Sequence, residues 1–343
     1  MESSLIVSAS ADRTVRVWKA PKKLYTFREL GNLRPILEVL KFLTSKEVIG
    51  IARVSKQFYE ASFHWEIQPG VSVFREVYLL EGHTSRVYSV AVSNNKEFVV
   101  SSGRDNAIRV WSLFTGKQTQ VLEGHSWEVL SVAISSKDKF VVSGGRDCSI
   151  RVWDLASGRQ TLVFNDHRDS VWSVAISSKD RLVVSGSADH TVKVWNLASG
   201  EQTRVFYSYH DVRAVAISGE NFVVSGSLDC SVRVWSLVSG QEVRALKGHG
   251  MAVYSVGISR CGEFLVSASK DKTIRVWSLK SGKQLKVLTG HTGLVMSVSI
   301  SPDGKYLVSG AFDNSIRVWD LTTGEQTQLL QGHTDCVRSV KLI

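Results

Sequence analysis

The sequence predicts an all-β fold in which seven similar four-stranded units close into a ring. First, a set of His, Ser, Asp and Trp recurs at near-constant spacing along most of the 343 residues. Second, successive tryptophans from Trp111 to Trp319 fall 42, 42, 40, 42 and 42 residues apart. Third, the two chain ends carry complementary parts of one further set. A fixed period of about 40 residues is typical of repeated units that bury a shared core.

The recurring sets establish that the chain closes on itself. Six of them lie in order along the sequence: His83, Ser101, Asp105, Trp111; His125, Ser143, Asp147, Trp153; His167, Ser185, Asp189, Trp195; His210, Ser225, Asp229, Trp235; His249, Ser267, Asp271, Trp277; His291, Ser309, Asp313, Trp319. Only the fourth is irregular, because its His lies closer to its Ser. The N-terminal segment supplies Ser8, Asp12 and Trp18 without a His, and His333 near the C-terminus completes this seventh set.

Each unit has the pattern of four strands. In the unit that starts at His125, short Val- and Ile-rich runs are bounded by Gly, Ser, Asp and Asn, which predicts strands at 129–134, 139–143, 149–153 and 159–164. The first three runs are almost continuously apolar, so we expect both of their faces to be buried. A glycine follows the third strand, as a tight turn with positive φ requires: Gly116, Gly158, Gly200, Gly240, Gly282 and Gly324.

With Gly-His early and Trp late, each unit resembles the WD40 repeat. Gly124-His125 and Arg151-Val152-Trp153-Asp154 carry the resemblance, although an Asp follows the Trp only at Asp154 and Asp320. The resemblance implies a seven-bladed β-propeller, closed by its N- and C-terminal strands and built from residues 1–18 and 75–343. It also implies a non-catalytic scaffold that binds protein partners, of the kind used in signalling, trafficking or cytoskeletal assembly.

The recurring Ser, His and Asp could instead belong to a nucleophilic active site. An enzyme needs such a set once, whereas this chain repeats it seven times. Repetition favours a buried network that links the Trp indole, Ser hydroxyl, His ring and Asp carboxylate of each unit. We therefore expect no catalytic residue. We also expect no metal or cofactor, because the two remaining histidines, His64 and His190, have no ligand-like neighbours in the sequence.

Composition limits the cellular context and the partner. No apolar run reaches the roughly 18–20 residues of a membrane helix, and the first residues lead directly into a predicted strand. The four cysteines, Cys148, Cys230, Cys261 and Cys336, form no CxxC pair, so we expect free thiols and a cytoplasmic or nuclear location. The net charge of +10 allows nucleic acid or acidic proteins as partners. Nucleic acid is the less favoured, because the chain has no lysine-rich tail or RNA-binding motif.

Residues 19–74 interrupt the repeat pattern. Pro21 and Pro69 bracket this segment, and the pattern returns at 77–83. The segment therefore replaces the turn between the third and fourth strands of the closing unit, unless residues 23–27 form that fourth strand. Inside it, the apolar period changes from 2 to about 3.6, which predicts a small α-helical insertion of three short helices.

The insertion also resembles an F-box, most closely at Val54-Ser55-Lys56-Gln57-Phe58-Tyr59. It departs from that family in its opening, Leu33-Arg34-Pro35, and in its place inside the closing unit. The resemblance implies binding of the small adaptor of a cullin-type ubiquitin ligase through Leu33, Ile36, Leu37, Leu40, Leu43, Val48, Val54 and Phe58. The alternative is that the three helices are purely structural and pack on the ring.

A recognition surface is predicted on one face of the ring, which we call the narrow face. It comprises the start of each unit's first strand and the turn before each recurring Asp, positions that vary while the scaffold repeats. Arginines beside aromatic side chains are typical of interaction hot spots, and guanidinium groups suit carboxylates and phosphates. We therefore predict an acidic or phosphorylated protein partner, bound by Arg86, Tyr88, Arg104, Arg146, Trp172, Arg213, Tyr254, Lys270, Met296, Phe312 and Arg338.

Overall fold

The computed structural model describes residues 4–20 and 74–343, which form 28 strands and no helix. The three predicted helices and the eight proposed adaptor-binding residues lie outside the described residues, so both remain predictions; of the predicted insertion 19–74, only Lys19, Ala20 and Phe74 are described, and Lys19 ends a strand. Within the described ranges, the structure contains no helix that could cross a membrane.

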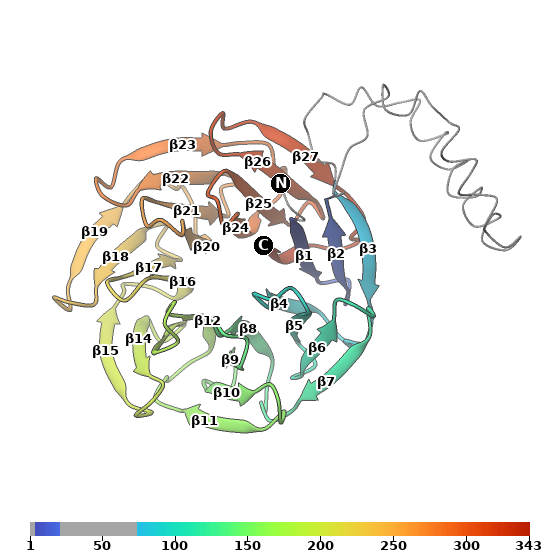
Figure 1. Cartoon of the computed structure of the whole chain (residues 1–343). Helices are drawn as coiled ribbons and strands as arrows, with labels where there is room; N and C mark the ends of the chain where they lie inside the picture. Colours follow the sequence, from blue (N-terminus) through green and yellow to red (C-terminus); the bar gives the residue numbers. More distant parts are fainter. Residues whose placement is uncertain (1–3, 21–73) are drawn as a thin grey trace, which may run out of the picture. The chain divides into compact units, whose positions relative to one another are not determined.

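The strands form seven antiparallel sheets of four, the blades, arranged around a central opening (Figure 1). We number the blades 1–7 in chain order and give their strands from the innermost outward. Blade 1 has β4 (Val87–Val92), β5 (Phe98–Gly103), β6 (Ile108–Ser112) and β7 (Gln118–Leu122). Blade 2 has β8 (Val129–Ile134), β9 (Phe140–Gly145), β10 (Ile150–Asp154) and β11 (Gln160–Phe164). Blade 3 has β12 (Val171–Ile176), β13 (Leu182–Ser187), β14 (Thr191–Asn196) and β15 (Gln202–Tyr207).

Blades 4–6 repeat this order, and blade 7 combines both chain ends. Blade 4 has β16 (Val212–Ser218), β17 (Phe222–Ser227), β18 (Val232–Ser236) and β19 (Glu242–Leu246). Blade 5 has β20 (Val253–Ile258), β21 (Phe264–Ser269), β22 (Ile274–Ser278) and β23 (Gln284–Leu288). Blade 6 has β24 (Val295–Ile300), β25 (Tyr306–Ala311), β26 (Ile316–Asp320) and β27 (Gln326–Leu330). Blade 7 has β28 (Val337–Leu342), β1 (Leu5–Ser10), β2 (Val15–Lys19) and β3 (Arg75–Leu80).

The pairing in blade 7 confirms that the chain ends close the ring. Strand β28 pairs with β1, and the backbone N–H groups of Leu5 and Ile343 each donate to the carbonyl of the other, at 2.9 and 3.0 Å. Strand β2 pairs with β3, so residues 75–80 form the fourth strand of this blade. The alternative fourth strand at 23–27 is therefore wrong, and residues 21–73 lie between the third and fourth strands.

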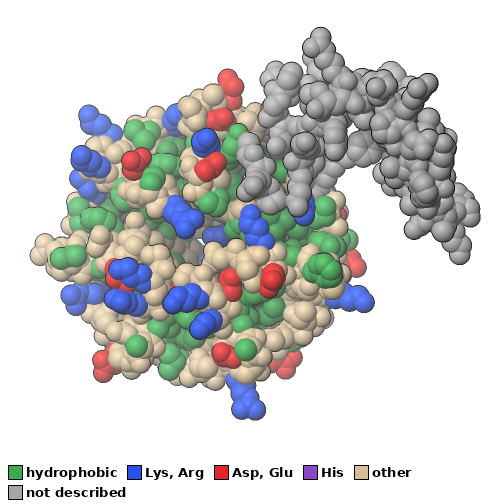
Figure 2. Space-filling view, in the orientation of Figure 1, with side chains coloured by type: hydrophobic (Ala, Val, Ile, Leu, Met, Phe, Trp, Pro, Cys, Tyr) green, Lys and Arg blue, Asp and Glu red, His purple; other side chains and the backbone are tan. Residues whose placement is uncertain are grey.

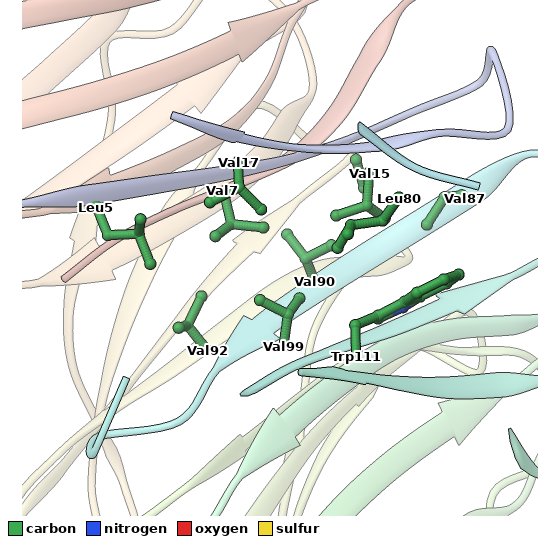
Figure 3. Packing of buried hydrophobic residues seen from close by; sticks show 11 residues of the cluster. Leu5, Val7, Val15, Val17, Leu80, Val87, Val90, Val92, Val99 and Trp111 are labelled. Carbon is green, nitrogen blue, oxygen red and sulfur yellow. The ribbon is translucent and has the colours of Figure 1, made fainter. Parts of the chain in front are cut away.

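The apolar runs form a core that continues from blade to blade. At the seam between blades 7 and 1, Val7 and Val17 pack with Val99 and Trp111, and each of these four is at most 1 % exposed (Figure 3). Burying a Val or Leu side chain contributes about 1.5–3 kcal/mol, and equivalent clusters fill the five seams from blade 1 to blade 6. The blades therefore stabilise one another through their faces.

Two local features set the geometry of the blades. The six glycines expected after third strands all have positive φ, from 68° at Gly116 to 86° at Gly324, as the sequence predicts. In addition, a Ser of the innermost strand accepts a hydrogen bond from a backbone N–H of the next blade at six seams, at 3.0–3.2 Å. These serines are Ser89, Ser131, Ser173, Ser255, Ser297 and Ser339. Blade 4 has Ala214 at this position.

Candidate protein-interaction face

The recurring sets form buried hydrogen-bond networks, as the sequence predicts. In blade 2, Trp153 Nε1 donates to Ser143 Oγ at 2.8 Å, and Ser143 Oγ lies 2.7 Å from His125 Nε2. His125 Nδ1 lies 2.9 Å from Asp147 Oδ2. The set shared by the two chain ends has the same form. Trp18 Nε1 donates to Ser8 Oγ at 3.1 Å, His333 Nε2 lies 2.9 Å from that oxygen, and His333 Nδ1 lies 2.8 Å from Asp12 Oδ2.

The carboxylate determines the direction of this network. Because an ionised Asp only accepts hydrogen bonds, the neutral His carries its proton on Nδ1, and the Ser hydroxyl donates to Nε2. Burial alone would raise the pKa of Asp147, but the hydrogen bond and charge of His125 and the Ser149 hydroxyl together hold that pKa well below its usual value. Burial would likewise raise the pKa of Asp12, but hydrogen bonds from His333 and Thr14 hold that pKa well below its usual value. In these two networks the Trp, Ser, His and Asp side chains are hydrogen-bonded to one another, so each network stabilises its blade.

Blade 4 departs from the predicted set. Trp235 Nε1 still donates to Ser225 Oγ at 2.8 Å, but His210 is exposed and contacts neither Ser225 nor Asp229. Arg233 takes the place of the His ring, because its Nη2 donates to Asp229 Oδ2 at 2.6 Å and its side chain is 7 % exposed. The assignment of His210 to the network was wrong. The shorter interval between His210 and Ser225 is the sequence signal of this difference.

The expectation for His190 also needs correction. Its Nε2 lies 3.4 Å from Asp211 Oδ1, and its ring centroid lies 6.1 Å from that of His210. The ring therefore has polar neighbours, although no group of three metal-binding side chains occurs among the described residues. The four cysteines lie in the described ranges and are free.

The positions assigned to the narrow face meet in pairs around the ring. In every blade, the backbone N–H of the residue before the recurring Asp donates to the carbonyl of the residue that precedes the innermost strand, at 2.8–3.1 Å. The donor–acceptor pairs are Arg104–Arg86, Arg146–Glu128, Ala188–Ser170, Leu228–Asp211, Lys270–Ala252, Phe312–Leu294 and Ala11–Cys336. The variable positions therefore form one continuous ring of residues.

Glu128 offsets part of the positive charge in one sector of this face. Its carboxylate lies 2.9 Å from Arg104 Nε and 3.4 Å from Arg146 Nη1, and it accepts a hydrogen bond from Tyr88 Oη at 3.3 Å. Burial and the charge of Glu128 raise the pKa of Tyr88, although Arg338 and Arg104 oppose this effect. Arg104 and Arg146 are half-exposed, but both already form an ion pair with a carboxylate of the protein.

Two other arginines are held on aromatic rings at the starts of innermost strands. The guanidinium of Arg213 lies 3.7 Å from the ring centroid of Trp172, and that of Arg338 lies 5.1 Å from the centroid of Tyr88. Three buried N–H donors of these residues have no hydrogen-bond partner, namely the Nε atoms of Arg213 and Arg338 and the Nε1 atom of Trp172. Burial lowers the pKa of Arg213, and the neighbouring Asp211 opposes this shift.

The rest of the face is cationic and partly apolar. Among the described residues, neither Arg86 nor Lys270 has a side-chain ion pair, and both are exposed. Phe312 is 48 % exposed, whereas Tyr254 and Met296 are partly buried. Figure 2 shows Lys and Arg side chains around the central opening on the side turned to the reader.

Sequence reasoning missed four residues near this face, all in the connections between blades. Trp127 is 58 % exposed, with the Arg146 guanidinium 5.6 Å from its ring, and Tyr209 is 78 % exposed beside Arg233. Asp169 and Asp335 add negative charge next to the strand starts, where each accepts the following backbone N–H. They lie one or two residues before the positions read from the repeat.

A comparison with protein families agrees with this architecture. The model described as WD domain, G-beta repeat matches residues 2–19, 74–112, 116–154, 158–196, 200–236, 240–278 and 282–320. From residue 74 onward, each match begins with the outermost strand of one blade and continues with the three inner strands of the next. The matched segments account for most of the chain. This protein therefore belongs to the WD40-repeat family.

Proposed function

We propose that this protein is a non-catalytic interaction scaffold whose narrow face binds an acidic or phosphorylated segment of a partner protein. The observation that carries the proposal is the set of uncompensated donors on this face. Arg86, Lys270 and Arg338 have no side-chain ion pair among the described residues, and Arg86 and Lys270 are exposed. A carboxylate or phosphate supplies the acceptors and the negative charge that these groups lack.

The arrangement also favours one sector of the face. Glu128 already pairs with both Arg104 and Arg146, so the attraction of these two arginines for an acidic ligand over blade 2 is reduced. We therefore expect the acidic group over blades 7 and 1, where Arg338 and Arg86 lie. Arg338 is held against Tyr88, so binding restricts little additional side-chain motion.

Affinity purification with quantitative mass spectrometry tests this function. We would compare the whole chain with an Arg86→Ala, Arg338→Ala double variant and with Lys137→Ala, an exposed lysine in the β8–β9 turn, as the matched control. Partners should be lost from the double variant and retained by the control, and phosphatase treatment shows whether phosphate is required. The same partners on all three proteins would contradict the proposal.

We further propose that residues 19–74 link the propeller to a cullin-type ubiquitin ligase, so that the narrow face presents a substrate. The F-box resemblance of the sequence supports this step, which concerns residues outside the described ranges. Leu40→Asp combined with Leu43→Asp should abolish binding of an F-box adaptor without changing the melting temperature of the propeller.

The alternative is a general WD40 scaffold with a structural insertion. It predicts that the unmutated protein retains no F-box adaptor in a pull-down, and that the same double substitution lowers the stability of the closing blade. Comparing the whole chain with a variant lacking residues 29–68 separates the two functions, because only the ligase subunit loses cullin-associated proteins.

A further inference from the structure

One residue of each outermost strand lies at the seam with the next blade. This residue pairs, across the two outer strands, with the Val that precedes the recurring Trp. At five seams it forms a hydrogen bond with the next blade, and we call this hydrogen bond the outer tie. Tyr78 Oη donates to the Phe114 carbonyl at 3.2 Å, and Gln120 Nε2 to the Leu155 carbonyl at 3.1 Å. The other three ties are Arg244 to Leu279, Lys286 to Thr322, and Phe74 N–H to Gln328.

Two seams have no outer tie. Between blades 2 and 3 the residue is Leu162, which packs with Leu197 on the apolar core. Between blades 3 and 4 it is Arg204, whose Nη1 donates to the carbonyl of Thr203 in its own strand at 3.0 Å. Arg204 reaches the turn at Gly240 but forms no hydrogen bond with blade 4. The guanidinium of Arg204 therefore has no hydrogen-bond partner in the next blade.

The turns opposite the narrow face also differ between seams, because the equivalent position is a carboxylate in blades 2–4 and a glycine in blades 5 and 6. Asp138 accepts hydrogen bonds from the N–H groups of Asn94 and Asn95, at 2.8 and 2.9 Å, and Asp180 accepts from Ser136 N at 2.7 Å. Each carboxylate thereby joins two successive blades. Glu220 is the corresponding residue of blade 4, but it accepts no backbone N–H.

Glu220 instead has one unsatisfied oxygen. Its Oε2 lies 3.6 Å from Lys179 Nζ, whereas its Oε1 is buried and has no hydrogen-bond partner. A buried carboxylate oxygen without a donor costs free energy that a ligand N–H could recover. Glu220 lines the space that the missing tie leaves between blades 3 and 4.

That space is a pocket of ≈ 340 Å³. Leu182, Val194 and Leu237 give it an apolar lining, and Arg181 and Arg204 are exposed along it. Neither arginine has a carboxylate partner among the described residues. Leu182 begins β13, and the opposite end of that strand leads to the narrow face. The pocket is therefore separate from the face described above.

We propose that this pocket is a second docking site, which binds an acidic, aliphatic peptide segment of a partner protein. A carboxylate of the segment accepts hydrogen bonds from Arg181 and Arg204, and an adjacent aliphatic side chain packs on the apolar lining. A backbone N–H of the segment donates to Glu220 Oε1. The volume lies at the lower end of ligand sites, which suits one or two side chains of an extended segment. This inference does not depend on the proposed function of the narrow face.

The test uses a random heptapeptide phage library, panned on the whole chain and counter-selected on an Arg204→Leu variant. This substitution places at the seam between blades 3 and 4 the leucine that the seam between blades 2 and 3 has at the equivalent position, Leu162. Enriched peptides should combine an acidic with an aliphatic residue. Their dissociation constants should rise at least about tenfold in Arg204→Leu and in Arg181→Ala, as expected for loss of a hydrogen bond between charged groups.

Two control variants locate the binding site. Arg244→Leu removes the equivalent arginine at the next seam, where it is tied to blade 5, and should change affinity less than about twofold. Lys270→Ala on the narrow face should behave likewise. The proposal is overturned if no peptide is enriched, if the enriched peptides lack an acidic residue, or if they bind folded Arg204→Leu and Arg181→Ala as tightly as the unmutated protein. Loss of binding in Lys270→Ala would assign the peptides to the narrow face and also overturn it.

Discussion

The substitution Asp147→Ala tests whether the recurring sets are structural. Four donors converge on this carboxylate: His125 Nδ1 at 2.9 Å, Ser126 N at 3.1 Å, Ser149 Oγ at 2.7 Å and Ser149 N at 3.1 Å. The His125 side chain is 0 % exposed, so its Nδ1–H has no access to water once the carboxylate is gone. Ser126 is exposed and can be rehydrated. The main cost is therefore one buried donor that is left with only the longer contact to Ser149 Oγ, at 3.3 Å.

That cost is about 1–3 kcal/mol. Since the entropy of unfolding is about 2.1 cal/mol/K per residue, each kcal/mol lowers the melting temperature of a domain of this size by about 1–2 °C. We expect a decrease of about 2–5 °C for Asp147→Ala, measured by circular dichroism. The matched control is Asp154→Ala, seven residues along, where the carboxylate accepts hydrogen bonds from Ser157 in an exposed turn. It should melt like the unmutated protein.

Two results would refute this reasoning. An unchanged melting temperature in Asp147→Ala would show that the network contributes no stability. Loss of partner binding or of any activity at full stability would show a direct functional role for the set. At equal concentrations of folded protein, Asp147→Ala should instead bind partners as tightly as the unmutated protein.

Three further predictions concern the ring as a whole. Deleting residues 331–343 removes β28 and His333 and leaves the edge of β1 unpaired, so size-exclusion chromatography should show aggregates; a monomer with an unchanged melting temperature would contradict ring closure. Ala214→Ser restores the missing acceptor between blades 4 and 5 and should stabilise by about 0.5–1 kcal/mol in urea unfolding; a lower midpoint would argue against the bond. Acidification should destabilise the protein, because burial lowers the pKa of His249 and the pKa of Asp147 is held low, so the unfolded chain binds protons more readily. The urea midpoint should begin to fall below about pH 6.5 and fall more steeply below about pH 4, and a constant midpoint down to pH 3 would contradict this.

Local patterns explain why the scaffold was predictable from sequence. Strands 129–134 and 159–164 begin and end within one residue of the prediction, because each is a short apolar run between turn residues. Closure followed from a single chemical requirement, since Ser8 and Asp12 needed the His that only His333 could supply. The residues of the narrow face could be read from the repeat because every unit places them at the same offset.

The remaining features depend on contacts between units. The sequence places an arginine or a lysine before each Val-Trp pair, so the shorter interval before Ser225 marks blade 4 as irregular but does not show that Arg233 replaces the histidine there. Arg204 and Glu220 lie in different blades. They stand out only because equivalent residues of other blades form hydrogen bonds between blades, whereas Arg204 and Glu220 form none. The identity of a partner depends on side-chain placement across seven units, which periodicity does not encode.

The pairing of β28 with β1 has a consequence for biosynthesis. Strands β1 and β2 are translated before the other described strands, yet β1 gains its inner neighbour only when residues 337–342 have been translated. Blades 1–6 contain only strands from one continuous stretch of chain, so they can assemble while the N-terminal hairpin waits. We expect a nascent chain to expose the inner edge of that hairpin until β28 has been translated, which makes the hairpin a target for chaperones during that time.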